Sequence, residues 1–157
     1  MEVRNFEPED AENVSRLIVQ NLRQVLTKAY PNEAMEALVP LFSPEKIIEA
    51  SKRQVVLVGI LEDALVGTAT LDNDWVKNVF VDVARHRSGI GKKLMAAIEA
   101  YAQGQDLKKV YLMAAMPACG FYEKLGYTIV KRSERDLNGI VISEVQMEKV
   151  LPTMNGE

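Results

Sequence analysis

The sequence predicts an α/β (α+β) fold, in which a mixed, mostly antiparallel central sheet of about seven strands carries helices on both faces. Short strand-like apolar runs alternate along the chain with longer segments of helical periodicity. The early strand candidates are joined by short turns, which favours antiparallel pairing, whereas helices separate the later ones. The chain has 157 residues, of which 48% are hydrophobic and 26% charged, so it can bury one proper core.

The N-terminal part of the chain is predicted to form a short strand and a long helix. The strand covers residues 3–6, and the helix runs from residue 8 to about 29, where Tyr30 and Pro31 end it. Apolar residues at helical spacing form the buried side of this helix: Val14, Leu17, Ile18, Leu22 and Val25.

Helices and strands alternate through the rest of the chain. Two short helices are expected within 32–52, the second with Ser43 as N-cap and Pro44 in its first turn. The later helices are expected at 88–103 and 117–125. The remaining strands are expected at 54–61, 65–71, 76–82, 109–114, 127–133 and 140–149. The turn before the last strand is Asp-Leu-Asn-Gly, at 136–139.

The most informative segment, residues 79–94, joins a strand to a helix through a basic turn that contains two glycines. Such a turn directs unpaired N–H groups and the positive end of a helix at one point, which suits a phosphate or pyrophosphate. Gly89 and Gly91 let the backbone approach the anion closely. Two other anion loops are excluded, because Leu94 stands where a dinucleotide fingerprint needs Gly and Lys93 where a Walker A loop needs Ser or Thr. The surrounding basic residues are Arg85, Arg87, Lys92 and Lys93.

The helix after this turn has one apolar stripe, expected to be buried: Ile90, Leu94, Ala97, Ile98 and Tyr101. A second motif, FYEKLGY, follows at 121–127. Helical spacing places Ala118, Phe121 and Leu125 toward the core and Tyr122 at the edge of that face. Without further context, Tyr122 would be a core-edge residue with its hydroxyl in water.

Together, the motifs HRSGIG, at 86–91, and FYEKLGY resemble the signature of the GNAT superfamily of acyl-CoA-dependent N-acetyltransferases. The resemblance implies that backbone N–H groups of the turn hold the pyrophosphate of acetyl-CoA, the cosubstrate. It implies that strands 76–82 and 109–114 splay apart, with the acyl-pantetheine arm between them, and that Tyr122 lies beside the thioester sulfur as the catalytic residue. The contacts that it implies for acetyl-CoA are Val79, Phe80, Val81, Val83, Arg87, Ser88, Gly89, Ile90, Gly91 and Lys92.

The sequence departs from the family pattern in several places. His86 replaces the usual Gln or Arg at the first position of the turn, and Val83 stands where many members have Pro. Neither 76–81 nor 109–114 contains a Glu or Asp, where relatives often keep a general base. The proton of the acceptor amine is therefore expected to leave through water or to a carboxylate outside these strands. The candidates for that carboxylate are Glu33, Asp72 and Asp74.

The predicted function is the transfer of an acetyl group from acetyl-CoA to a primary amine by direct attack, with Tyr122 as general acid. Two alternatives stay open. The first is an acyl-CoA-binding regulatory or sensor module without efficient turnover, which the missing strand carboxylates keep in play. The second is an anion- or nucleotide-binding domain unrelated to CoA, against which the spacing of both motifs argues. The segment 22–52 should cover the acceptor side, but its composition does not indicate which amine is the acceptor.

Composition also bears on the location, the partners and the domain organisation of the protein. The single cysteine, Cys119, forbids an internal disulfide, and the N-terminus is too polar for a signal peptide, so a cytoplasmic location is expected. The net charge of −3 argues against general nucleic-acid binding, and no apolar run is long enough to span a membrane. No metal site is expected, and a homodimer is left open. Residues 1–151 are expected to form a single domain, with a frayed tail at 152–157.

Overall fold

A computed structural model describes residues 1–153, which fold around one seven-stranded sheet in the order β1-β2-β3-β4-β5-β7-β6. The pairing of β4 with β5 is parallel, and every other pairing is antiparallel. The strands are β1 Glu2–Asn5, β2 Val55–Leu61, β3 Ala64–Asp72, β4 Trp75–Val81, β5 Lys109–Ala115, β6 Thr128–Leu137 and β7 Ile140–Val150. The mixed, mostly antiparallel sheet predicted from the sequence is therefore confirmed.

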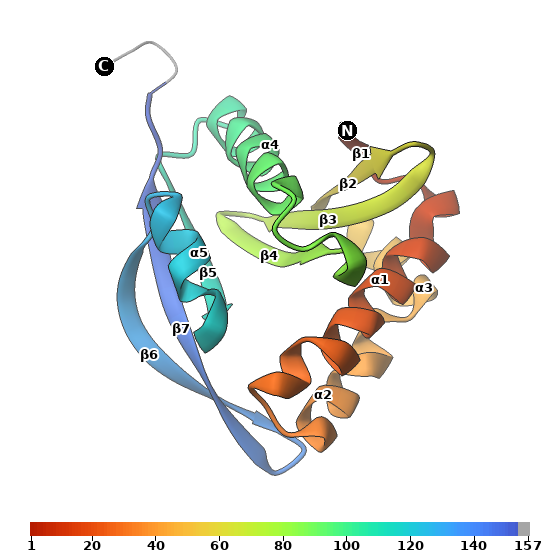
Figure 1. Ribbon diagram of the computed structural model, residues 1–157. Coiled ribbons are helices and arrows are strands. Elements are labelled where there is room, and N and C mark those ends of the chain that lie inside the picture. The colour runs from red at the N-terminus through yellow and green to blue at the C-terminus, as the bar shows by residue number, and fades with distance from the viewer. Residues whose placement is uncertain (154–157) are drawn as a thin grey trace.

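Helices cover both faces of the sheet, as expected (Figure 1). The helices are α1 Ala11–Gln24, α2 Asn32–Leu38, α3 Pro44–Ser51, α4 Ile90–Gly104 and α5 Cys119–Lys124. Short 3-10 turns lie at Pro8–Asp10, Leu26–Lys28, Val39–Phe42, Val83–Arg85 and Met116–Ala118. One core cluster packs under α4 and α5, and the other lies under α1, α2 and α3. Leu57 and Val58 alternate along β2 into the first and second cluster respectively, because successive side chains of a strand point to opposite faces.

Two elements differ from the sequence prediction by more than two residues at an end. The helix expected up to residue 29 ends at Gln24 and continues as a 3-10 turn. The strand expected to end at 133 continues to Leu137, where the Asn138-Gly139 turn leads into β7. Both turn residues have positive φ, 53° and 86°, as a two-residue hairpin turn requires. The strand was predicted too short because β6 is an exposed edge strand, so its last residues lack the alternation that marks a half-buried strand.

The sheet parts between β4 and β5. The two strands pair only at Trp75 with Tyr111 and at Val76 with Leu112, and the rings of Trp75 and Tyr111 lie 5.4 Å apart there. Beyond these pairs the strands diverge, as Figure 1 shows, which is the splay expected from the resemblance. A β-bulge in the pairing of β3 with β4 adds to the bend, and Asn78 has a φ of 54° at this point.

Helix α4 is tied to the C-terminal strand by a polar network. Glu99 accepts hydrogen bonds from the Tyr127 hydroxyl, at 2.8 Å, and from the Lys149 ammonium group, at 2.7 Å. Burial and the Glu99 charge both raise the pKa of Tyr127. The apolar stripe of α4 is largely as predicted, but Tyr101 was wrongly assigned to it. Tyr101 is exposed, and Met95 is buried instead, because the sheet covers α4 one residue further round.

We expect Glu99→Ala to lower the free energy of unfolding by about 1–3 kcal/mol, because it leaves a hydroxyl and an ammonium group without their partner in a largely buried setting. Urea denaturation measures the change. The matched control is Glu36→Ala, which removes a carboxylate from a well exposed ion pair with Arg23 and should leave the midpoint nearly unchanged. Equal effects of the two substitutions would contradict a structural role for Glu99.

Residues 154–157 of the predicted tail lie outside the described residues. The carbonyl of Pro152 accepts a hydrogen bond from the Gln103 side chain at 2.7 Å, so the first part of the tail lies against the end of α4. Within residues 1–153, no helix combines the length and the apolar character that crossing a bilayer requires.

Candidate active site

The glycine-containing turn ends at the first turn of α4. Gly89 is the N-cap, with a φ of 84°, a conformation that side chains other than Gly rarely adopt. The first bond of the helix runs from the Lys93 N–H to the Gly89 carbonyl at 3.2 Å. The N–H groups of residues 90–92 therefore have no partner within the helix and point out of its N-terminus. This is the arrangement that the sequence predicted for an anion site.

Gly91 leaves room at the surface of this helix end. A Cβ atom at this position would lie 3.1 Å from Cζ of Phe121 and 3.7 Å from Cγ2 of Val81. The backbone of α4 thus approaches α5 and β4 to a distance that a side chain would obstruct. The missing side chain lets Phe121 and Val81 pack closely against the start of this helix.

Cationic side chains surround the turn. Arg87, Lys92 and Lys93 are exposed, and Arg87 itself has a positive φ of 66°. Arg85 is partly neutralised by Asp82, whose carboxylate lies 3.6 Å from its guanidinium group and also accepts from the Ala84 N–H. The Ser88 hydroxyl donates to the Arg85 carbonyl and closes the turn. Positive charge therefore remains available where a pyrophosphate would lie.

On the edge of β4 that faces the gap, the Val81 carbonyl is contacted by side chains from outside the sheet. The Asp82 N–H donates to Val66 in β3, so strand alternation turns the N–H and C=O of Val81 away from β3. The Val81 carbonyl accepts from the Asn21 side chain at 2.9 Å, and Nε2 of His86 lies 3.1 Å from it. Within the described residues no strand covers this side of 79–81, so the backbone groups there other than the Val81 carbonyl can pair with a ligand.

Phe80, one of the predicted acetyl-CoA contacts, lines the cavity described below. Its backbone pairs with Thr68 in β3, and its side chain packs against the cluster under α1. Asn21 was missed in the sequence because it interrupts the apolar side of its helix as an isolated polar residue. It is buried and bonds both Leu17 and Val81, which ties α1 to the parted strand.

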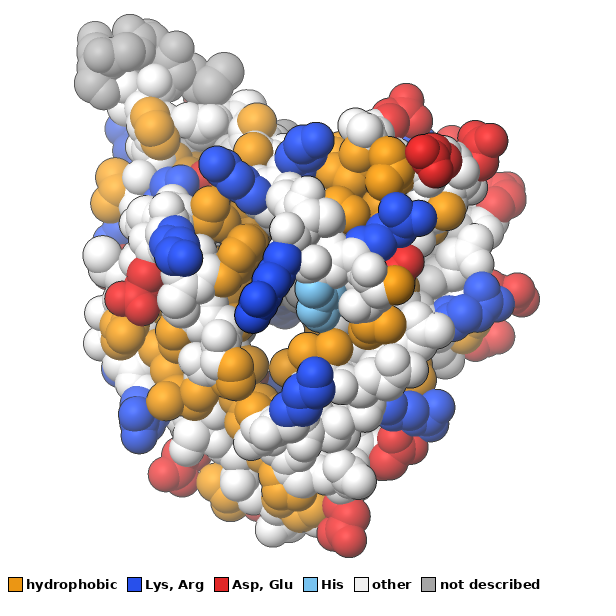
Figure 2. Space-filling view, in the orientation of Figure 1, with side chains coloured by type: hydrophobic (Ala, Val, Ile, Leu, Met, Phe, Trp, Pro, Cys, Tyr) orange, Lys and Arg blue, Asp and Glu red, His pale blue; other side chains and the backbone are white. Residues whose placement is uncertain are grey.

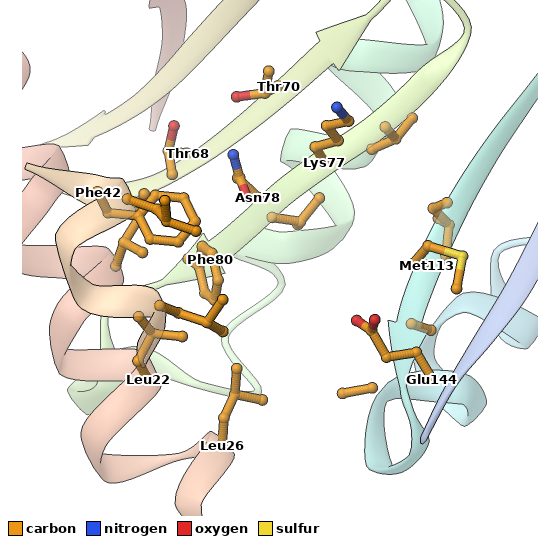
Figure 3. A pocket seen from close by; sticks show the side chains of 18 of the residues that line it. Leu22, Leu26, Phe42, Thr68, Thr70, Lys77, Asn78, Phe80, Met113 and Glu144 are labelled. Carbon is orange, nitrogen blue, oxygen red and sulfur yellow. The ribbon is translucent and has the colours of Figure 1, made fainter. Parts of the chain in front are cut away.

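A cavity of about 740 Å³ occupies the parting of the sheet and continues toward α1, α2 and α3. Figure 2 shows the surface hollowed on one face, with Lys and Arg side chains around the opening. Figure 3 shows Leu22, Leu26, Phe42 and Phe80 on one side of the cavity, and Met113 and Glu144 on the other. The volume is in the range of sites that enclose small molecules.

Tyr122 lines this cavity from α5. Its side chain is 9% exposed, whereas Phe121 is 38% exposed, so the predicted order of the two residues was wrong. Phe121 instead lies over the surface that Gly91 leaves free at the start of α4. The Tyr122 ring packs edge-to-face on Tyr127, with centroids 5.8 Å apart, and no described side chain or backbone group hydrogen-bonds its hydroxyl.

Burial raises the pKa of Tyr122 to about 12. The phenol is thus a weaker acid than the ordinary value of ~10 suggests. It stays protonated over the whole physiological pH range and can donate a proton to a strongly basic atom that reaches the cavity.

The sequence from residue 19 to 127 matches the model of a protein family described as the acetyltransferase (GNAT) family. The chain belongs to this family. Its fold is similar to that of a GCN5-related N-acetyltransferase from Rhodopseudomonas palustris, with 25% identity, a TM-score of 0.89 and coverage of 96% of this chain and 95% of the other. No curated protein matches the sequence.

Other solved structures share the fold at lower identity. The PaiA N-acetyltransferase from Thermoplasma acidophilum, in complex with coenzyme A, is 19% identical, with a TM-score of 0.77 and coverage of 95% and 98%. The ribosomal-protein-alanine N-acetyltransferase from Brucella melitensis is 18% identical, with a TM-score of 0.75 and coverage of 96% and 100%.

This acetyltransferase presents a carboxylate to the cavity that the sequence reasoning missed. Glu144 lies in β7, paired with Ala115 of β5 and Ser133 of β6, and its side chain is 17% exposed. Burial raises its pKa, and the Arg135 guanidinium, 4.0 Å away, opposes the shift. The spacing of Ile142 and Glu144 could have indicated from the sequence that both side chains point to the same face of the strand. Only the sheet order shows that this strand lies beside β5.

The carboxylates proposed from the sequence lie elsewhere in this acetyltransferase. Glu33 is exposed on α2, and Asp72 is engaged by Lys77 at 2.7 Å and by Gln54 at 3.2 Å. Asp74 lines a separate, shallower depression near Tyr101. None of the three lines the cavity. Within residues 1–153, no group of three or more His, Cys, Asp or Glu residues is arranged to hold a metal ion.

Proposed function

We propose that this acetyltransferase transfers the acetyl group of acetyl-CoA to a primary amine by direct attack, with Tyr122 as general acid. The observation that carries the proposal is the position of Tyr122, which is buried on a cavity that begins where β4 and β5 part. In support, the same parting leads to the glycine turn at the start of α4. The acceptors named for the similar proteins differ, so they do not indicate the acceptor of this chain.

In the proposed arrangement, the N–H groups of residues 90–92 hold the pyrophosphate, with Arg87 and Lys92 adding positive charge. The backbone of β4 near Val79 and Val81 pairs with the amide groups of the pantetheine arm. Acetyl-CoA supplies a thioester at the end of this arm. The Tyr122 hydroxyl then delivers a proton to the sulfur as the C–S bond breaks, which makes the thiol a better leaving group.

Release of free thiol from acetyl-CoA in the presence of a mixed set of primary amines tests the proposal. We expect release to depend on both the protein and an amine, and mass spectrometry to detect the acetylated amine. The alternative is an acyl-CoA-binding sensor module, which the unpaired backbone along β4 would serve equally well. It predicts that calorimetry detects acetyl-CoA binding while no amine causes thiol release.

A further inference from the structure

We propose that the acceptor is a primary monoamine with an apolar body, and that Glu144 holds its ammonium group and takes its proton. The inference rests on the proposed acetyl transfer and names the substrate class of the same cavity. Four observations lead to it: the direction of the Glu144 side chain, its charged neighbours, the apolar wall opposite, and the balance of charge around the cavity.

Strand alternation sets the direction of Glu144. Val145 and Met147 are buried in the cluster under α4 and α5, so Glu144 points to the other face of the sheet. Ala115 of β5 pairs with Glu144 and so points to the same face. Met113, two residues before Ala115 in β5, also points to this face. Figure 3 shows the Glu144 carboxylate directed into the cavity.

The neighbours of Glu144 leave its carboxylate available. Arg135, on β6, approaches it only to 4.0 Å and is itself well exposed. The Tyr30 hydroxyl donates to the backbone carbonyl of Ser143, at 2.8 Å, which fixes β7 next to Glu144 and leaves its carboxylate unengaged. No hydrogen bond to the Glu144 carboxylate is formed by the described residues, whereas an amine can supply one.

The wall opposite Glu144 is apolar. It is formed by Leu22 of α1, Leu26 just after it, Phe42 of the turn before α3, and Phe80 of β4, as Figure 3 shows. A bound molecule whose amino group reaches Glu144 would place its remainder against these side chains. Burying an aromatic ring on such a wall contributes about 1.5–3 kcal/mol.

The balance of charge disfavours polyamines. The cationic residues that line the cavity are Lys46, Lys77 and Arg135, and the acidic residues among the described lining residues are Glu134 and Glu144. Glu134, on β6, pairs with Ser143 of β7, and its side chain lies on the exposed side of β6. One inward carboxylate can hold one ammonium group, and the other described lining residues offer no second inward carboxylate for another.

The proton balance of the transfer fits this assignment. The bound ammonium group gives one proton to the Glu144 carboxylate, and the freed lone pair attacks the thioester carbon. The C–N bond forms and the C–S bond breaks, with the electron pair leaving on sulfur. The proton that nitrogen then releases replaces the one that Tyr122 gives to sulfur, and Glu144 returns its proton to water.

The test compares 2-phenylethylamine, ethylamine and spermidine as acceptors. We expect kcat/KM for 2-phenylethylamine to exceed those for ethylamine and spermidine by at least about tenfold. Glu144→Gln should lower kcat/KM for 2-phenylethylamine at pH 7 by about 100-fold or more. The matched control is Glu148→Gln on the same face of β7, where the lost charge belongs to an ion pair with Lys109 outside the cavity.

The pH profile separates a base from a packing residue. In the parent, kcat/KM should fall as the pH drops through the raised pKa of Glu144, because the protonated carboxyl no longer holds an ammonium ion. Above that pKa it should stay level up to the pKa of the amine. In Glu144→Gln it should instead rise about tenfold per pH unit up to the amine pKa, because only free amine reacts. Parallel profiles would overturn the role of Glu144.

Calorimetric titration of each amine into the complex with CoA keeps the inference separate from the proposed transfer. Transfer to spermidine in preference to 2-phenylethylamine would overturn the inference and leave the acetyl transfer intact. If no amine is acetylated but 2-phenylethylamine binds and Glu144→Gln weakens it, the acceptor site stands and the proposed function fails. Should Glu144→Gln not fold, the order of the three amines with the parent protein decides.

Discussion

Tyr122→Phe should lower kcat by about 10²–10⁴-fold, the usual value of a positioned proton donor. The substitution removes one oxygen atom that no described group of the chain hydrogen-bonds, and the edge-to-face contact with Tyr127 is kept. Fold and acetyl-CoA affinity should therefore survive. Because the pKa of Tyr122 is raised to about 12, we expect no loss of kcat from its deprotonation between pH 6 and about 10.

The measurement compares kcat of Tyr122→Phe and the parent with an acceptor found by screening, and calorimetry checks acetyl-CoA binding. Tyr101→Phe is the matched control, since it removes the same atom from an exposed tyrosine on α4. A loss smaller than about threefold with binding intact would make Tyr122 a packing residue and favour the sensor module.

Gly91→Val should weaken acetyl-CoA binding by about 10–100-fold. The added Cβ would lie 3.1 Å from the Phe121 ring, so the new side chain takes up space at the helix end where the phosphates are proposed to lie; each tenfold loss corresponds to about 1.4 kcal/mol of binding free energy. The methyl groups would also stand beside the N–H groups proposed to hold the pyrophosphate. Calorimetric titration with acetyl-CoA measures the loss, and circular dichroism checks that the variant is folded.

Gly104→Val provides the matched control, at the other end of the same helix. A Cβ there meets no atom within 4 Å, so the substitution changes the helix composition without touching the turn. Acetyl-CoA affinity should then be unchanged. A folded Gly91→Val that binds acetyl-CoA like the parent would show that the pyrophosphate lies elsewhere.

The order of the elements could be predicted from the sequence because it depends on local patterns. The glycine turn, the Asn138-Gly139 hairpin and the N-cap at Ser43, whose side chain accepts from the Lys46 N–H, are each specified by residues close in the chain. The faces of α5 could not be predicted this way. A six-residue helix has too few positions for its apolar spacing to identify the buried face. The Phe121 side chain packs beside Gly91 of α4, a contact between helices that the sequence pattern does not reveal.

Glu144 was missed for a similar reason. Its importance comes from the insertion of β7 between β5 and β6, so that a residue near the end of the chain lies opposite α1. A carboxylate in an alternating strand is, by itself, an ordinary solvent-facing residue. Only tertiary pairing reveals that this one is largely buried, and the same holds for the contact of Asn21 with Val81.

The parting of β4 and β5 has a thermodynamic consequence. Two residue pairs join the β1–β4 part of the sheet to the β5–β7 part, so an extended ligand in the gap supplies backbone pairing that the chain itself lacks. Such a ligand binds the folded state alone, and at a hundred times its dissociation constant it adds about 2.7 kcal/mol to the free energy of unfolding. If acetyl-CoA binds there as proposed, the resistance of this protein to unfolding should rise with the concentration of that ligand.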